Sequence, residues 1–176
     1  MTRRSPRLVA AFVALVLCAG AAGARQRRGP STPEERRRAV EVATLLENDP
    51  LSKDAKRLRE ELLRFLIEAP DIQVTLCTDV LGDLSKIKGD YAPVITAQLT
   101  FSTAKFVIEH PEQAGDHQRA FLAGVEGVLR AYQNIRKAKP KAEMKPLEEL
   151  LAKQQAGGLA DFVKAAAEAA GCKSGG

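Results

Sequence analysis

Apolar residues recur at spacings of three and four along most of residues 32–172, and this spacing is typical of amphipathic helices. The stripe is clearest over residues 55–69, where its members are Ala55, Leu58, Leu62, Phe65 and Ala69. The other side of this segment carries opposite charges four residues apart, such as Arg57 and Glu61. Pairs of this kind are typical of a solvated helix surface. We therefore interpret the charged side as surface and the apolar side as core.

Local signals predict where the helices begin and end. Thr32 is a candidate N-cap, Pro33 suits a first turn, and Glu35 completes a capping box. Proline interrupts the pattern at positions 50, 70 and 111, and the glycines at 157, 158 and 171 are typical of helix C-termini. The expected helices span residues 33–48, 55–69, 89–109, 117–137, 146–156 and 159–170.

Residues 72–84 fit two patterns. Ile72, Val74 and Leu76 alternate as in a strand, but Ile72 and Leu76 also begin a four-residue repeat that continues to Leu84. The sequence offers no second strand, and a lone strand leaves its backbone groups unpaired. We predict a further helix here, although Gly82 weakens it. The chain is then an all-α, compact single domain, a helical bundle of about six to seven helices.

Residues 89–109 form the most apolar of these segments. One stripe consists of Val94, Ala97, Phe101, Ala104 and Ile108, and Ile95, Leu99 and Phe106 form a second. The polar breaks are Gln98, Ser102, Thr103 and Lys105. A helix that is apolar over so much of its circumference is usually central. We expect the other helices to pack around it.

The helix expected over 117–137 carries a continuous stripe of very small residues, namely Ala120, Gly124, Gly127 and Ala131. A glycine inside a helix costs about 1 kcal/mol relative to alanine, so two of them need a reason. One interpretation is close packing against the preceding helix. The other is a groove, floored by this stripe and bordered by Phe101, that receives a small apolar ligand or a helix of a partner.

The N-terminus predicts export. Arg3, Arg4 and Arg7 precede an apolar run over residues 8–18, and small residues follow up to Ala24. This is the layout of a secretory signal peptide over residues 1–24, with cleavage after Ala24 or, as an alternative, after Ala21. We expect a periplasmic or secreted protein with a disordered lead-in over 25–31, a helical domain over 32–172 and a tail over 173–176. No transmembrane segment is expected after cleavage.

Cleavage changes the charge and the cysteine count. Three of the 27 basic residues and none of the 22 acidic ones lie in residues 1–24, so the net charge falls from +5 to +2. A sustained basic face is therefore not expected, and nucleic acid is excluded as a partner. Cys18 is removed as well, which leaves Cys77 and Cys172. Two cysteines in an oxidising compartment predict a disulfide, which would join the last helix to the one expected at 72–84.

Candidate chemistry is sparse. His110 and His117 flank a polar loop with Glu112 and Asp116, but their spacing matches no known zinc motif, and we assign them as weak metal candidates only. The sequence contains no G-x-S-x-G, H-E-x-x-H, phosphate-binding loop or C-x-x-C motif. We predict no cofactor and no catalytic residue. The leading hypothesis is an exported, non-enzymatic module that binds another protein; alternatives are a carrier or sensor of a small apolar ligand and an unusual helical enzyme.

Overall fold

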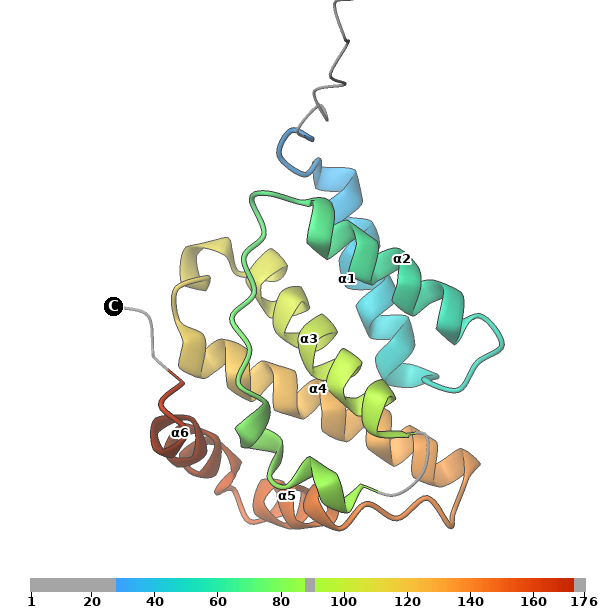
Figure 1. The fold of residues 1–176 in the computed structure, drawn as a ribbon, viewed down its shortest axis with the longest axis vertical. Helices are drawn as coiled ribbons and strands as arrows, with labels where there is room; N and C mark the ends of the chain where they lie inside the picture. Colours follow the sequence, from blue (N-terminus) through green and yellow to red (C-terminus); the bar gives the residue numbers. More distant parts are fainter. Residues whose placement is uncertain (1–27, 88–90, 173–176) are drawn as a thin grey trace, which may run out of the picture.

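Six α-helices and three short 3₁₀ turns make up the regular structure of residues 28–87 and 91–172, the part of the chain that this computed structural model describes (Figure 1). The α-helices are α1 (Pro33–Asn48), α2 (Ala55–Glu68), α3 (Tyr91–Glu109), α4 (His117–Ala138), α5 (Lys145–Gln155) and α6 (Leu159–Ala169). The turns are η1 (Thr78–Leu81), η2 (Leu84–Lys86) and η3 (Pro111–Gln113). These ranges contain no strand, so the all-α prediction is confirmed. The predicted signal peptide and the tail over 173–176 lie outside the described residues.

The predicted helix boundaries are largely confirmed because they depend on local chemistry. The Thr32 hydroxyl accepts a hydrogen bond from the Glu35 N–H at 3.2 Å, and the Glu35 carboxylate accepts one from the Thr32 N–H at 2.8 Å. Both halves of the predicted capping box are therefore present. At the other end of the chain, Gly157 and Gly171 follow α5 and α6 with φ of 76° and 67°. Glycine adopts this left-handed conformation at little cost, so it ends helices well.

The helix predicted over residues 72–84 is wrong. Residues 72–77 form an irregular connection, which leads into η1 and η2. In Figure 1 this connection, in green, runs from the end of α2 past α3 to the opposite end of the molecule. An extended residue covers about 3.3 Å and a helical residue 1.5 Å, so the connection reaches farther than a helix of the same number of residues would. Its exposed residues, which include Gln73 and Thr75, leave the backbone accessible to water, and a pairing strand is not required.

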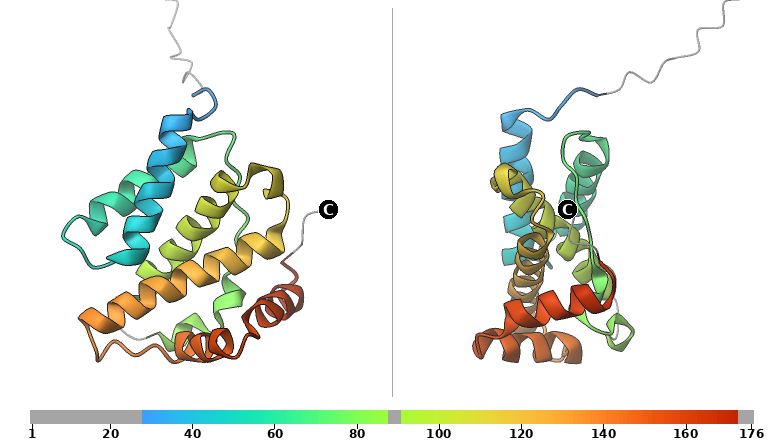
Figure 2. Two further views of the ribbon diagram at one scale, coloured as in Figure 1. Left: turned by 180° about the vertical axis from the view of Figure 1, so that it is seen from behind. Right: turned by 90° about the vertical axis from the view of Figure 1, so that its left-hand side faces the viewer.

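The predicted central position of α3 is confirmed. It packs most extensively against α4 and also contacts α1 and α2. Figure 2 shows α1 and α2 at one end of the molecule and α5 and α6 at the other, with α3 and α4 between them. The buried apolar residues form two clusters. Phe101 of α3 packs with the stripes of α1 and α2, whereas Ile95 and Leu99 pack with α4, α5, α6 and the turns.

A disulfide joins Cys77 to Cys172, across a sequence separation of 95 residues and a Cα–Cα distance of 5.9 Å. The predicted pair is therefore confirmed. The bond fixes the end of α6 to the irregular connection just before η1, and not to a helix as expected. None of the described helices is both long enough and apolar enough to cross a membrane.

Candidate functional site

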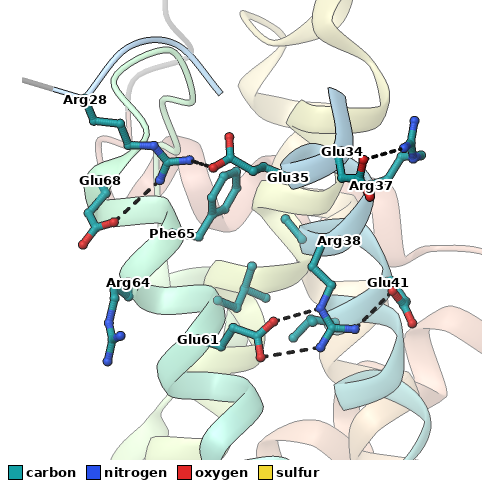
Figure 3. A pocket seen from close by; sticks show the side chains of 13 residues that line it. Arg28, Glu34, Glu35, Arg37, Arg38, Glu41, Glu61, Arg64, Phe65 and Glu68 are labelled. Carbon is teal, nitrogen blue, oxygen red and sulfur yellow. Dashed lines mark hydrogen bonds and ion pairs between the residues drawn. The ribbon is translucent and has the colours of Figure 1, made fainter. Parts of the chain in front are cut away.

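A groove with a volume of about 540 Å³ lies between α1 and α2 (Figure 3). We call it the α1–α2 groove. Its apolar residues are Ala39 and Val42 from α1 and Leu62 and Phe65 from α2. Nine charged residues complete it: Arg28, Glu34, Glu35, Arg37, Arg38, Glu41, Glu61, Arg64 and Glu68. An apolar floor with a charged border is therefore present on one face of the molecule.

The amphipathic sequence of both helices produces this arrangement. The stripes of α1 and α2 face each other and bury Ala39, Val42 and Leu62, while Phe65 keeps part of its surface accessible. The charged residues flank these stripes, so packing of the apolar faces brings the charges of the two helices together above the contact. The side chains that close the groove are thus ionic and partly hydrated.

Arg38 connects the two helices across the groove. Its Nε donates a hydrogen bond of 2.8 Å to Glu61 on α2, and its Nη1 donates one of 3.2 Å to Glu41 on its own helix. Hydrogen bonding to Glu61 raises the pKa of the Arg38 guanidinium above its ordinary value. The Arg38 and Glu61 side chains are 44% and 36% exposed. Ion pairs with this exposure contribute only about 0.2–1 kcal/mol, so the bridge can open at a low cost.

Arg28 makes a second bridge. It precedes α1, and its guanidinium forms a hydrogen-bonded ion pair with Glu35 and lies 3.6 Å from the carboxylate of Glu68 on α2. The central carbon (Cζ) of the Arg28 guanidinium is 5.3 Å from the centre of the Phe65 ring, within the range of a cation–π contact. The pKa of Glu35 is lowered by the hydrogen bond from the Thr32 backbone and then by the one from Arg28.

Asp71 holds the segment that carries Arg28. Residues 28–31, which we call the N-terminal arm, are not helical, but Ser31 is buried. The Ser31 N–H and hydroxyl each donate a hydrogen bond of 2.8 Å to the Asp71 carboxylate, and Arg36 donates one of 2.6 Å. The bonds from Ser31 lower the pKa of Asp71 well below its usual range. Asp71 therefore anchors the arm.

The stripe of Ala120, Gly124, Gly127 and Ala131 lies against α3, and all four residues are buried. A Cβ atom placed on Gly127 would lie 1.9 Å from the Ser102 hydroxyl oxygen, and one on Gly124 would lie 2.3 Å from that of Thr103. Side chains of α3 therefore take the space that a ligand would need above these glycines. Phe101 is also buried, in the cluster with α1 and α2. The arrangement corresponds to close helix packing.

A buried polar cluster, which the sequence pattern did not predict, lies where α1, α3 and α4 meet. Glu47 is 2% exposed; its carboxylate accepts hydrogen bonds from Ser102 at 2.8 Å and from Arg130 at 2.9 Å, and it lies 3.5 Å from the Lys105 ammonium. Gln98 donates to Ser102 at 2.9 Å. Three of the four polar breaks of α3 are thus interior residues, since Gln98, Ser102 and Thr103 are each at most 2% exposed, whereas Lys105 is partly exposed. No buried side-chain polar atom among the described residues lacks a partner.

The two histidines lie at the ends of the loop between α3 and α4. The His110 ring packs on Phe106 with centroids 4.9 Å apart, and its Nδ1 lies 3.8 Å from Glu112. His117 begins α4 and stacks on Phe121. Within residues 28–87 and 91–172, a group of three possible metal ligands occurs only at Cys77, Asp79 and Cys172. Zinc binds cysteine as the thiolate, whereas both of these cysteines are joined in the disulfide.

The sequence pattern does not predict the α1–α2 groove, because the charges of α2 also fit pairs within one helix. Of the expected pairs, Arg57–Glu61 is present at 3.2 Å, but Glu61 and Glu68 also reach residues outside α2. The run Arg36-Arg37-Arg38 was the available signal, because it places cations beside the apolar stripe of α1. Which glutamates these cations meet depends on how the helices pack. No family model, curated protein or solved structure matches this chain.

Proposed function

We propose that this chain is an exported, non-enzymatic binding module that contacts a partner protein through the α1–α2 groove. The groove carries the proposal, because it combines a volume of about 540 Å³ with an apolar floor and a charged border. Ligand pockets typically have volumes of about 300–1,000 Å³. Protein interfaces commonly depend on one apolar or aromatic anchor that fills such a pocket, inside a polar border.

The solvent exposure of the groove residues also supports recognition of a partner. Phe65 is only partly buried, and the bridge from Arg38 to Glu61 is solvated, so a partner can displace it without exposing the core. The exported location is part of the same proposal. The pattern of residues 1–24 supports it, and so does a disulfide that closes a long loop, since such bonds persist mainly in oxidising compartments.

A carrier of small apolar molecules was the alternative, with a groove at Gly124 and Gly127. In this structure Ser102 and Thr103 fill that space. A ligand would need α3 and α4 to separate, which would expose the Glu47 cluster to it. The α1–α2 groove requires no separation of helices, and we therefore propose it as the contact surface.

Photo-cross-linking in the native host tests the proposal. A photoreactive phenylalanine analogue replaces Arg64, which is exposed and lines the groove; the control replaces Lys164, which is exposed on α6 at the other end of the molecule. We expect one discrete cross-linked protein from position 64, identified by mass spectrometry, and none from position 164. Absence of a product at position 64, or the same product from both positions, would contradict the proposal.

The location is tested on the purified native protein. We expect an intact mass that begins at Arg25 or Ala22 and is lower by two hydrogens than that of the dithiol chain. A product that retains residues 1–24, or one with two reduced thiols, would contradict export.

A further inference from the structure

The α1–α2 groove already holds a guanidinium, which belongs to the chain itself. The Arg28 group lies between a carboxylate of α1, Glu35, and a carboxylate of α2, Glu68, and it covers the Phe65 ring at 5.3 Å (Figure 3). Two carboxylates and an aromatic face are the groups that recognise an arginine side chain, since they combine ion pairing with a cation–π contact. The site thus has the groups that bind an arginine side chain.

Arg28 belongs to neither of the helices that form the site. It lies in the N-terminal arm, five residues before Pro33 begins α1, and the arm is tied down at Ser31 through Asp71. Among the described residues, only 28–30 therefore need to move for Arg28 to leave the site. Such a movement leaves the capping box at Thr32 and the packing of both helices intact. A second arginine could then enter the same position.

The charge of the groove without Arg28 selects a cation. Five glutamates and three arginines remain among the residues that line it. Among the described residues, Arg28 is the only cation that pairs with Glu35 or Glu68, whereas Glu61 has Arg38 and Arg57. Departure of Arg28 would leave two carboxylates uncompensated beside an aromatic ring. An arginine from outside restores the charge balance, and an acidic segment would make it worse.

We propose that Glu35, Phe65 and Glu68 form a binding site for an arginine side chain of the partner protein, and that Arg28 occupies this site when the partner is absent. This inference rests on the proposed function, because it specifies the chemistry of the partner that the groove receives. In this arrangement Arg28 of the N-terminal arm competes with the partner's arginine for the site. Removing the competing side chain should strengthen binding, and removing either carboxylate should weaken it.

An NMR titration of the isotope-labelled chain tests this. The probe is an acetylated, amidated pentapeptide with a single arginine between alanines, and its counterpart has glutamine in place of arginine. With the R28A variant we expect saturable shifts of the Glu35 and Glu68 amides and of the Phe65 ring at millimolar peptide. The wild-type chain should bind at least fivefold more weakly, because Arg28 competes. The glutamine peptide should produce no saturable shifts.

Two substitutions on α2 separate the site from general effects of charge. In the R28A background, E68Q should weaken binding of the arginine peptide about three- to tenfold. E60Q removes the same charge from an exposed residue that does not line the groove, and it should leave binding unchanged. Equal weakening by both substitutions, equal shifts with the glutamine peptide, or equal affinity of the wild type and R28A would overturn the arginine site.

The two proposals can fail separately. A cross-linked partner at position 64 together with no arginine-dependent shifts would overturn the arginine site and leave the groove as a contact surface. Arginine-dependent shifts without any cross-linked partner would support the site chemistry and contradict the proposed function.

Discussion

The interface of α3 with α4 and the α1–α2 groove use the same charged residue types for different purposes. At the interface, Glu47 is 2% exposed and its carboxylate meets Ser102, Arg130 and Lys105. In the groove, Glu61 meets Arg38 while more than a third of each side chain stays exposed. Burial makes the first set costly to disturb, because water cannot replace a lost partner. Exposure makes the second set easy to exchange, as recognition of a partner requires.

Glycine shows the same contrast. Gly124 and Gly127 allow α3 to approach α4 so closely that its hydroxyl groups fill the space of a missing Cβ. Neither α1 nor α2 contains a glycine, and space of about 540 Å³ remains above the apolar floor of the groove between them. The interface should therefore respond strongly to small changes of volume or charge, and the groove should tolerate them. Three predictions test this difference and a fourth tests the anchor of the N-terminal arm, from the largest expected effect to the smallest.

Gly127→Ala should lower the free energy of unfolding by about 3 kcal/mol. The new Cβ would lie 1.9 Å from the Ser102 hydroxyl oxygen and 2.3 Å from the Ser102 Cβ; side-chain rotation cannot move the Ser102 Cβ away, so the helices must separate. The gain of about 1 kcal/mol in helix propensity offsets only part of this cost. Denaturant unfolding measures the difference. Gly115→Ala is the control, since no atom lies within 4 Å of its Cβ, and a change beyond about 0.5 kcal/mol there is not expected.

Glu47→Gln should destabilise the fold by about 2 kcal/mol. The amide keeps the shape of the side chain but removes the charge that Arg130 and Lys105 share. Breaking a fully buried pair costs about 3–5 kcal/mol; the cost here is smaller because Arg130 is 46% exposed and reaches water. Glu149→Gln, at an exposed position of α5, is the matched control. Equal stability of the two variants would show that the buried cluster does not hold the three helices together.

Arg38→Ala should lower stability by less than about 1 kcal/mol, because its ion pairs with Glu61 and Glu41 are exposed. The effect should also shrink at high salt, which screens exposed charges. Parallel unfolding curves at low and high salt check both statements. A loss as large as that of Gly127→Ala would mean that the Arg38 bridge supports the fold, and the groove would then be a poor candidate for exchange with a partner.

Asp71→Asn should cause a small loss of stability that depends on pH. The pKa of Asp71 is lowered by its bonds to Ser31, so the carboxylate stabilises the fold at pH values above the unfolded pKa of about 4. This contribution is lost as the pH falls towards the lower, folded pKa. The difference in unfolding free energy between wild type and variant should therefore be constant near neutral pH and shrink below about pH 4. A difference that does not change with pH would show that Asp71 acts without its charge.

The sequence predicted those parts of the fold that depend on neighbouring residues. Thr32 and Glu35 form the expected capping box, and the glycines at 157 and 171 follow helix ends. The disulfide was predictable only together with the expectation that a signal peptide carrying Cys18 is cleaved, which would leave one possible pair. The prediction failed at residues 72–84, where the periodicity fits both a helix and a strand. The contacts of η1 with α4, α5 and α6, which the periodicity does not reveal, accompany an irregular connection over residues 72–77. The groove was not predictable, because its charges come from separate segments.

The sequence by itself determined the helical class, most helix boundaries, the apolar stripes and the cysteine pair. The first three follow from interactions within a few residues, and the cysteine pair follows from the expectation that Cys18 is lost with a signal peptide. Only the tertiary structure decided that Glu47 is an interior residue, that α3 fills the glycine stripe, and that Arg28 lies between Glu35 and Glu68. The physical reason is that burial and charge pairing depend on which surfaces meet, and the order of residues along one helix does not specify the helix that will cover it.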